Sequence, residues 1–247
     1  MNVLKFIPNC LKKIYTGKYT ILNHITIFSI CGIYSVITTM LDGMEKAKFM
    51  PDINLLVISA IILIITAIYL TGYTYTFINK YHDESAIGLP DTSENPIIAF
   101  WKSIPLGLCW MAYCLVFSAL CIAIFFKILI MGIILITLIS SVLMSLIFVA
   151  FCENYDAKEL FNVLKPFKWV KKSFKEIFQF VSIFIILLIA IIAILVISGI
   201  ILKTFNINPD CAVCSYIYAI ICGYIGFILQ LIWDYGFIQI YKKSNDL

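Results

Sequence analysis

Residues 177–202 read IFQFVSIFIILLIAIIAILVISGIIL, a long apolar run without a single charged side chain. A helix needs about 20 mainly apolar residues to cross the hydrocarbon core of a bilayer. Four other segments, 20–41, 53–79, 104–151 and 213–241, have the same mainly apolar character. The pattern predicts an all-α integral membrane protein.

The composition of the whole chain agrees with this pattern. Of its 247 residues, 62% are hydrophobic and 13% are charged, and the mean hydropathy is +1.02. Soluble domains are about 45–50% apolar and about 25% charged. The composition excludes a soluble enzyme, a disordered tail and a nucleic-acid binder.

The segment 104–151 is too long for one span. A straight helix over it would measure about 72 Å, more than two membrane thicknesses. Its only charged residue is Lys127, and Gly132 follows shortly after. We therefore expect a turn there and six spans arranged as three hairpins in one membrane domain, covering residues 20–41, 53–79, 104–127, 130–151, 177–202 and 213–241.

The lysines predict the orientation. All 18 basic residues are lysine, and with a cytoplasmic N-terminus fourteen of them fall in inner connections and four in outer ones. Cytoplasmic loops of membrane proteins carry such an excess of positive charge. We expect both termini to be cytoplasmic, in a prokaryotic plasma membrane. Lys102 and Glu153 both fall at this inner face, where we expect them to pair.

Two further segments have helical amphipathic patterns. Residues 3–18 place their apolar side chains opposite the lysines, and residues 153–176 do the same, with Pro166 expected to break or kink the helix. Both patterns predict helices in the cytoplasmic headgroup layer, before spans 1 and 5. The basic side chains of the second segment are candidates for docking anionic lipid headgroups or a protein partner: Lys165, Lys168, Lys171, Lys172 and Lys175.

Small residues indicate where helices pack against one another in lipid. In the last span, Ser215, Ala219 and Gly223 recur every four residues, and Gly226 continues the row. We expect this face to contact other helices. The span 177–202 is almost entirely isoleucine and leucine, and we expect it to face lipid most.

Asp234 is the leading candidate for a functional residue, because a charge inside a membrane helix is costly and is often functional. It lies eight residues before Lys242, about 12 Å along a helix. With Gln230 one turn earlier, it is suited to bind a proton or a cation. The alternative is an interfacial aspartate with water access, between the aromatic residues Trp233 and Tyr235.

Cys211 and Cys214 form a C-A-V-C motif at the start of the last span. Such a pair can be redox-active or form a disulfide, because a helix N-terminus lowers a thiol pKa. The two histidines, His24 and His82, are far apart in the sequence and belong to no metal-ligand motif. We therefore expect no metal and no cofactor.

One stretch resembles a known family. Gly72-Tyr73 ends a span, Gly88-Leu89-Pro90-Asp91 follows in a polar connection, and Phe100-Trp101-Lys102 begins the next span. This order resembles the prokaryotic membrane family catalogued as domain of unknown function 4013. The resemblance implies six spans and no catalytic residues. The chain departs from the family after Asp91, where Thr92 and Ser93 stand in place of the usual aromatic residue.

Three functions fit these features. The first is a non-enzymatic, membrane-embedded subunit of an export or envelope system, docked through the lysines of 153–176 to anionic lipid or a protein partner. The second is a small-solute or proton-coupled transporter that uses Asp234. The third is a membrane thiol redox protein that uses Cys211 and Cys214. A homo-oligomer is compatible with each.

Overall fold

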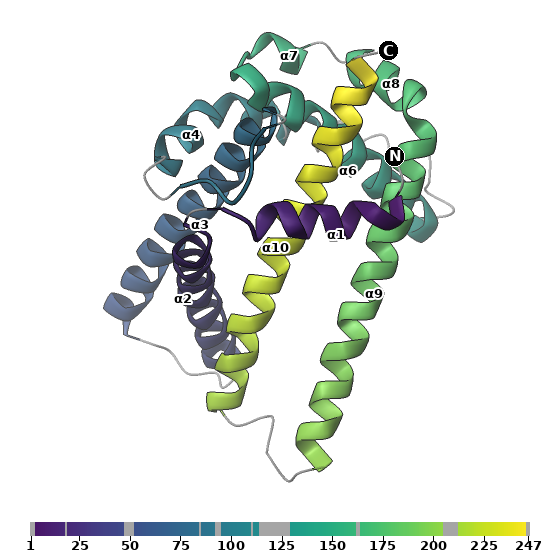
Figure 1. Ribbon diagram of the computed structural model, residues 1–247. Coiled ribbons are helices and arrows are strands. Elements are labelled where there is room, and N and C mark those ends of the chain that lie inside the picture. Colours follow the sequence, from purple (N-terminus) through teal and green to yellow (C-terminus); the bar gives the residue numbers. More distant parts are fainter. Residues whose placement is uncertain are drawn as a thin grey trace.

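The computed structural model describes residues 3–17, 19–46, 52–83, 85–91, 95–109, 111–113, 129–161, 164–204 and 212–245. Within these ranges the regular structure is entirely α-helical, which confirms the predicted fold class (Figure 1). The helices are α1 (Val3–Ile14), α2 (Thr20–Lys46), α3 (Ile53–Tyr81), α4 (Pro96–Lys102), α6 (Leu129–Asn154), α7 (Lys158–Phe161), α8 (Leu164–Lys172), α9 (Phe174–Thr204) and α10 (Ala212–Asn245).

Among the described residues, four helices are long and apolar enough to cross a membrane. Their apolar segments are Thr20–Met44, Ile53–Tyr81, Phe174–Ile201 and Val213–Asn245. The protein is thus a multi-pass membrane protein. The other two predicted spans, 104–127 and 130–151, correspond to shorter apolar helices, Ile104–Tyr113 and Ile139–Asn154. The first span falls partly on residues outside those described, and the side chains of residues 130–138 in the second are not described. Six spans and the three-hairpin layout therefore stay predictions.

The central helix is α10. Its most extensive contact is with α2, and it also packs on α6, α3, α8, α9 and α1. Gly223 permits the close approach to α2, because a Cβ there would lie 2.1 Å from Ser35 Oγ. The predicted small-residue row divides at this point. Gly223 packs on α2, Ser215 and Ala219 line a cavity facing α9, and Gly226 has no described neighbour within 4 Å.

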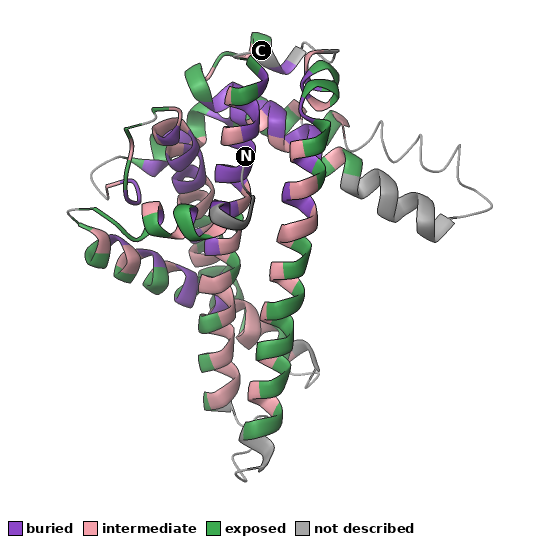
Figure 2. Cartoon of the chain, turned by 45° about the vertical axis from the view of Figure 1, so that its right-hand side comes forward, coloured by how far each residue is buried: buried purple, intermediate pink, exposed green. Residues whose placement is uncertain are grey.

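The helix α9 is exposed along most of its length (Figure 2). The exposed side chains lie on several sides of the helix and include Ile186, Ile189, Ile194 and Ile197, each more than half exposed. Its described contacts with α10, α8 and α1 are sparse. This arrangement agrees with the expectation that residues 177–202 face lipid.

The helix α1 lies across α10 and α9 (Figure 1). Phe6, Cys10 and Ile14 lie on its apolar face, as the periodicity predicts, and all three are buried. They are covered by protein: the Phe6 ring packs against Phe180 of α9 and Tyr235 of α10, at centroid distances of 5.4 and 5.6 Å. Neighbouring helices therefore cover these three side chains, and the location of α1 in the headgroup layer stays a prediction.

The segment 153–176 forms two short helices, α7 and α8. The first helix, α7, ends at Phe161, and α8 begins at Leu164, two residues before Pro166. As the third residue of α8, Pro166 costs no intrahelical bond. Pro166 and Trp169 are buried, whereas Phe167 is half exposed.

The stretch that resembles the known family begins inside α3. The expectation that Gly72-Tyr73 ends a helix is wrong, because α3 continues to Tyr81. Gly72 lets α4 approach, since a Cβ there would lie 1.9 Å from the carbonyl oxygen of Pro96. The Tyr73 hydroxyl donates to the Pro90 carbonyl at 3.1 Å, and the Lys80 ammonium donates to the Leu89 carbonyl at 3.1 Å. These motif residues hold the 85–91 loop against α3.

Gly88 in this loop has a φ of +72°, a left-handed conformation that favours glycine. Its N–H donates to the Lys13 carbonyl at 2.9 Å, at the end of α1. The loop therefore joins α3 to α1 as well.

Candidate functional site

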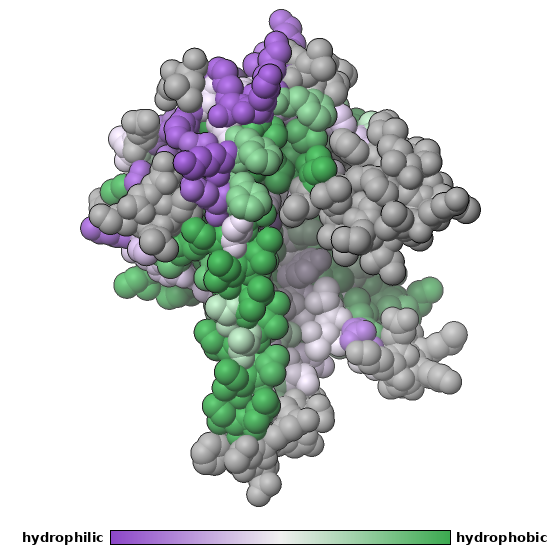
Figure 3. Space-filling view, turned by 90° about the vertical axis from the view of Figure 1, so that its right-hand side faces the viewer, coloured by the Kyte–Doolittle hydropathy of each residue, from purple (hydrophilic) through white to green (hydrophobic). Residues whose placement is uncertain are grey.

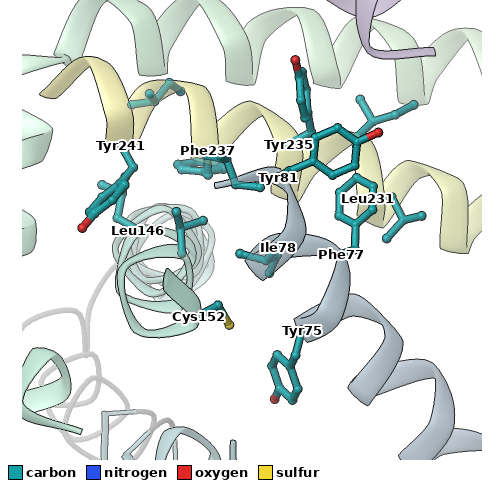
Figure 4. Packing of buried hydrophobic residues seen from close by; sticks show 14 of the residues in the cluster. Tyr75, Phe77, Ile78, Tyr81, Leu146, Cys152, Leu231, Tyr235, Phe237 and Tyr241 are labelled. Atoms are coloured by element: carbon teal, nitrogen blue, oxygen red, sulfur yellow. The ribbon is translucent and has the colours of Figure 1, made fainter. Parts of the chain in front are cut away.

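Asp234 lies in the most densely packed part of α10. Figure 4 shows this stretch of α10 with Leu231, Tyr235 and Phe237, against residues of α3 and α6. Leu231 and Phe237 are fully buried, and Asp234 itself is 5% exposed. The side chain lies close enough to Tyr75 of α3 to interact electrostatically. Protein side chains therefore enclose Asp234 and leave it little access to water in this structure, while its position at the membrane interface stays a prediction.

One of the two carboxyl oxygens of Asp234 has a hydrogen-bond partner among the described residues, and the other has none. Gln230 Nε2, one turn earlier on α10, donates to Asp234 Oδ1 at 3.0 Å. The other oxygen, Oδ2, is buried and has no hydrogen-bond partner among the described residues. Leaving a buried acceptor unsatisfied costs about 1–3 kcal/mol, and more when the group is charged. The predicted pairing with Gln230 is present, and the geometry leaves one oxygen of Asp234 available.

A polar contact on α6 flanks this carboxyl group. Trp233, the residue before Asp234, donates from Nε1 to Ser145 Oγ at 2.8 Å. Ser145 in turn donates to the carbonyl of Ser141 at 2.8 Å. Cys152, also on α6, is fully buried and is an electrostatic neighbour of Asp234. The carboxyl group therefore lies where α3, α6 and α10 meet.

A second polar cluster joins the same three helices nearer the end of α10. The Tyr241 hydroxyl donates to Glu153 Oε2 at 2.8 Å, and Asn79 Nδ2 donates to the Cys152 carbonyl at 2.6 Å. Tyr241 lies seven residues after Asp234, which places it on the same face of α10, about 10 Å further along. The two clusters thus share one face of α10.

His82 belongs to this second cluster. Its Nε2 lies 2.9 Å from the Val149 carbonyl, which can only accept, so Nε2 carries the proton. Burial lowers the pKa of His82, and the Lys242 ammonium lowers it further, while the Val149 carbonyl and Glu153 act in the opposite direction. The Lys242 ammonium nitrogen is itself buried without a hydrogen-bond partner in the described ranges. Additional positive charge is therefore unfavourable here.

The expected pair of Lys102 and Glu153 is not formed. Glu153 accepts from Tyr241, and the Lys102 ammonium lies over the Tyr155 ring, 5.3 Å from its centroid. The sequence places both charges at the inner face. The sequence does not show that Tyr241 of α10 supplies a hydroxyl group to Glu153.

A third polar contact lies on the other side of α10. His24 Nδ1 is 2.7 Å from the Tyr224 hydroxyl, and the Tyr15 ring stacks on the imidazole at a centroid distance of 4.3 Å. His24 is therefore hydrogen-bonded at the beginning of α2. The contact ties α1, α2 and α10 together.

An aromatic cluster that the sequence did not indicate holds the beginning of α9 on α10. Phe180 of α9 packs against Trp233 and Phe237 of α10, each at a centroid distance of 5.7 Å. Gly236 makes the contact possible, since a Cβ there would lie 2.2 Å from Phe180 Cζ. The sequence does not indicate that Gly236 lies opposite an aromatic residue of another helix.

The candidate docking lysines divide into two groups. Lys165 and Lys172 have partners within the protein: the first lies over the Trp169 ring of α8, and the second donates to the Ser244 carbonyl of α10 at 3.2 Å. Lys168, Lys171 and Lys175 are exposed and make no hydrogen bond or ion pair with the described residues. The charges of this second group are available at the surface for a ligand or partner.

The structure does not test the cysteine pair, because Cys211 lies outside the described residues. Cys214 is half exposed near the beginning of α10. Within the described ranges, no group of three or more His, Cys, Asp or Glu side chains is placed to hold a metal ion.

Comparisons of the chain with family models, with curated proteins and with solved structures found no match. The resemblance to family 4013 therefore stays a prediction, and the functional argument rests on the geometry of the site.

Proposed function

We propose that the protein is a proton-coupled transporter of a small solute, with Asp234 as the residue that binds the proton. The observation that carries this proposal is the unpaired oxygen Oδ2 of Asp234, in a side chain that is 5% exposed inside a candidate span. Ionisable residues in such positions are typical of proton relays and substrate paths.

Binding of the proton is coupled to packing at the junction of α3, α6 and α10. An ionised carboxyl group with one unpaired oxygen is costly in a closed apolar junction. Proton binding at Oδ2 removes that charge and stabilises the closed packing described above. Loss of the proton favours a state in which water reaches Oδ2. A ligand can shift a conformational equilibrium only through such a difference in stability between states.

The arrangement of the helices agrees with the orientation that the lysines predict. α1 and the end of α10 lie in the half of the molecule that contains α7 and α8, whereas α9 ends and α10 begins at the opposite end (Figure 1). The lysine-rich segments therefore share one end of the molecule. We propose that this end is cytoplasmic, in a prokaryotic plasma membrane, with both termini on that side.

A pH jump on a solid-supported membrane tests the role of Asp234 without knowledge of the solute. Proteoliposomes of the wild-type chain should give a transient current as protons bind inside the membrane. The variant Asp234→Asn, which keeps the shape and the Gln230 contact, should lose this current. Asp156→Asn is the control, because Asp156 is exposed between α6 and α7. An unchanged current in Asp234→Asn would refute the proposal.

The membrane-embedded subunit of an export or envelope system remains the competing proposal. It is supported by the exposed lysines of α8 and the beginning of α9, Lys168, Lys171 and Lys175. Purification from native membranes in mild detergent separates the two proposals. A stoichiometric ATPase or second membrane subunit would favour the subunit, whereas a single chain or homo-oligomer would favour the transporter. The thiol redox role is a third proposal, refuted if a Cys211→Ser and Cys214→Ser double variant keeps full function.

A further inference from the structure

An apolar groove lies between α6, α8 and α9. It has a volume of about 200 Å³ and is walled entirely by apolar side chains. The lining residues from α8 and α9 that matter here are Phe167, Val170, Phe174 and Phe178; Val142 of α6 forms part of the opposite wall. Phe167, Phe174 and Phe178 are each at least half exposed.

Lysines alternate with these groove residues along the chain. Lys168, Lys171 and Lys175 each directly follow a groove residue, and all three are exposed. None of them makes a hydrogen bond or ion pair with the described residues, unlike Lys172, which donates to α10. The charges of these three lysines are therefore available to a ligand at the edge of the groove.

The groove lies at the boundary between the polar and apolar parts of the surface. In Figure 3 the hydrophilic side chains gather at the end of the molecule that carries α8, and the apolar surface of α9 begins directly below them. The groove includes the first residues of α9, so it lies at the depth where headgroups meet acyl chains if α9 spans the membrane. Exposed aromatic residues and lysines together are typical of this layer.

We propose that this groove binds one acyl chain of an anionic phospholipid, whose phosphate group is held by Lys168, Lys171 and Lys175. The apolar lining excludes a polar ligand from the groove, and the three positive charges at its edge complement a phosphate group. Basic pockets between membrane helices on the cytoplasmic side bind such headgroups. This site is independent of the proton-binding role of Asp234.

Native mass spectrometry of the full chain with added phosphatidylglycerol or phosphatidylcholine tests the proposal. The wild-type chain should bind the anionic lipid more tightly. Replacing all three lysines by glutamine should weaken phosphatidylglycerol binding by tenfold or more, since each lysine contributes about fivefold (about 1 kcal/mol). Phosphatidylcholine binding should weaken less, because the choline cation offsets the charge of its phosphate group. The matched control replaces Lys12, Lys102 and Lys158, which are exposed elsewhere.

A second variant tests the groove itself. Val170→Phe fills the groove at a half-buried position and should reduce the amount of both bound lipids. Val213→Phe is its control, because Val213 is 67% exposed at the beginning of α10. Equal binding of the two lipids by the wild-type chain, or equal losses in the two triple-lysine variants, would overturn the proposal. So would unchanged binding in Val170→Phe.

Discussion

Replacing Gly236 by alanine should separate α9 from α10 at their closest aromatic contact. The added Cβ would lie 2.2, 2.5 and 2.7 Å from three ring atoms of Phe180. Carbon atoms in contact are about 3.5–4.0 Å apart, so the ring must move by about 1 Å or more. It has little room, because Phe180 is 1% exposed and packs on Phe6, Trp233 and Phe237.

The expected loss is about 1–2 kcal/mol of unfolding free energy. Overpacking of this kind costs about 1–3 kcal/mol, and the change from glycine to alanine in a helix returns about 0.5–1 kcal/mol. For a chain of this size, each kcal/mol shifts the melting temperature by about 2–4 °C. Gly236→Ala should therefore melt about 2–8 °C lower in mild detergent, followed by the fluorescence of Trp233 and the other tryptophans.

Gly226→Ala on the same helix is the control. Gly226 has nothing within 4 Å in the described part of the chain, so its replacement should not lower the melting temperature. Phe180→Leu should partly relieve the clash, so that the double variant loses less than the sum of the two single variants. If Gly236→Ala melts like the wild type, the α9–α10 packing described above is wrong.

Three further results are expected. Gly72→Ala should lower the melting temperature at least as much as Gly236→Ala, because the added Cβ meets a backbone atom, the Pro96 carbonyl oxygen, at 1.9 Å; an unchanged melting temperature would contradict this. Burial lowers the pKa of His82, so the unfolded chain binds a proton more readily than the folded one. The stability that His82 contributes should be complete above about pH 6.5, the pKa in the unfolded chain, and should be lost as the pH falls below that value. His82→Gln should therefore flatten the melting temperature as a function of pH in this range. Equal slopes for the variant and the wild type would refute this prediction. Burial raises the pKa of the Cys10 thiol to about 12, so maleimide at pH 8 should label Cys10 only after denaturation. Mass spectrometry of the labelled peptide checks this, and rapid labelling in the native protein would contradict it.

The sequence predicted which residues form helices better than it predicted what covers each helix face. Apolar periodicity identified which face of α1 is buried, with Phe6, Cys10 and Ile14. It could not distinguish burial in lipid from burial against α9 and α10, because both environments favour the same side chains. Hydropathy reports the polarity of a helix face and not the partner that covers it.

The candidate site was also only partly predictable. Asp234 and Gln230 stood out because polar residues are rare in such spans, and their spacing of four residues predicted the contact. The lack of a partner for Oδ2 depends on which side chains α3 and α6 bring to the junction, and no spacing along the chain reports that. For the same reason, the role of Gly236 became evident only beside Phe180.

The most direct test of the central claim is the infrared absorption of the Asp234 carboxyl group as a function of pH. The proposal predicts a carbonyl band of a protonated carboxyl group that changes with pH in the wild-type chain, is absent in Asp234→Asn, and persists in Asp156→Asn. A band that is identical in the wild type and in Asp234→Asn would show that Asp234 does not exchange the proton, and the proposed function would fail.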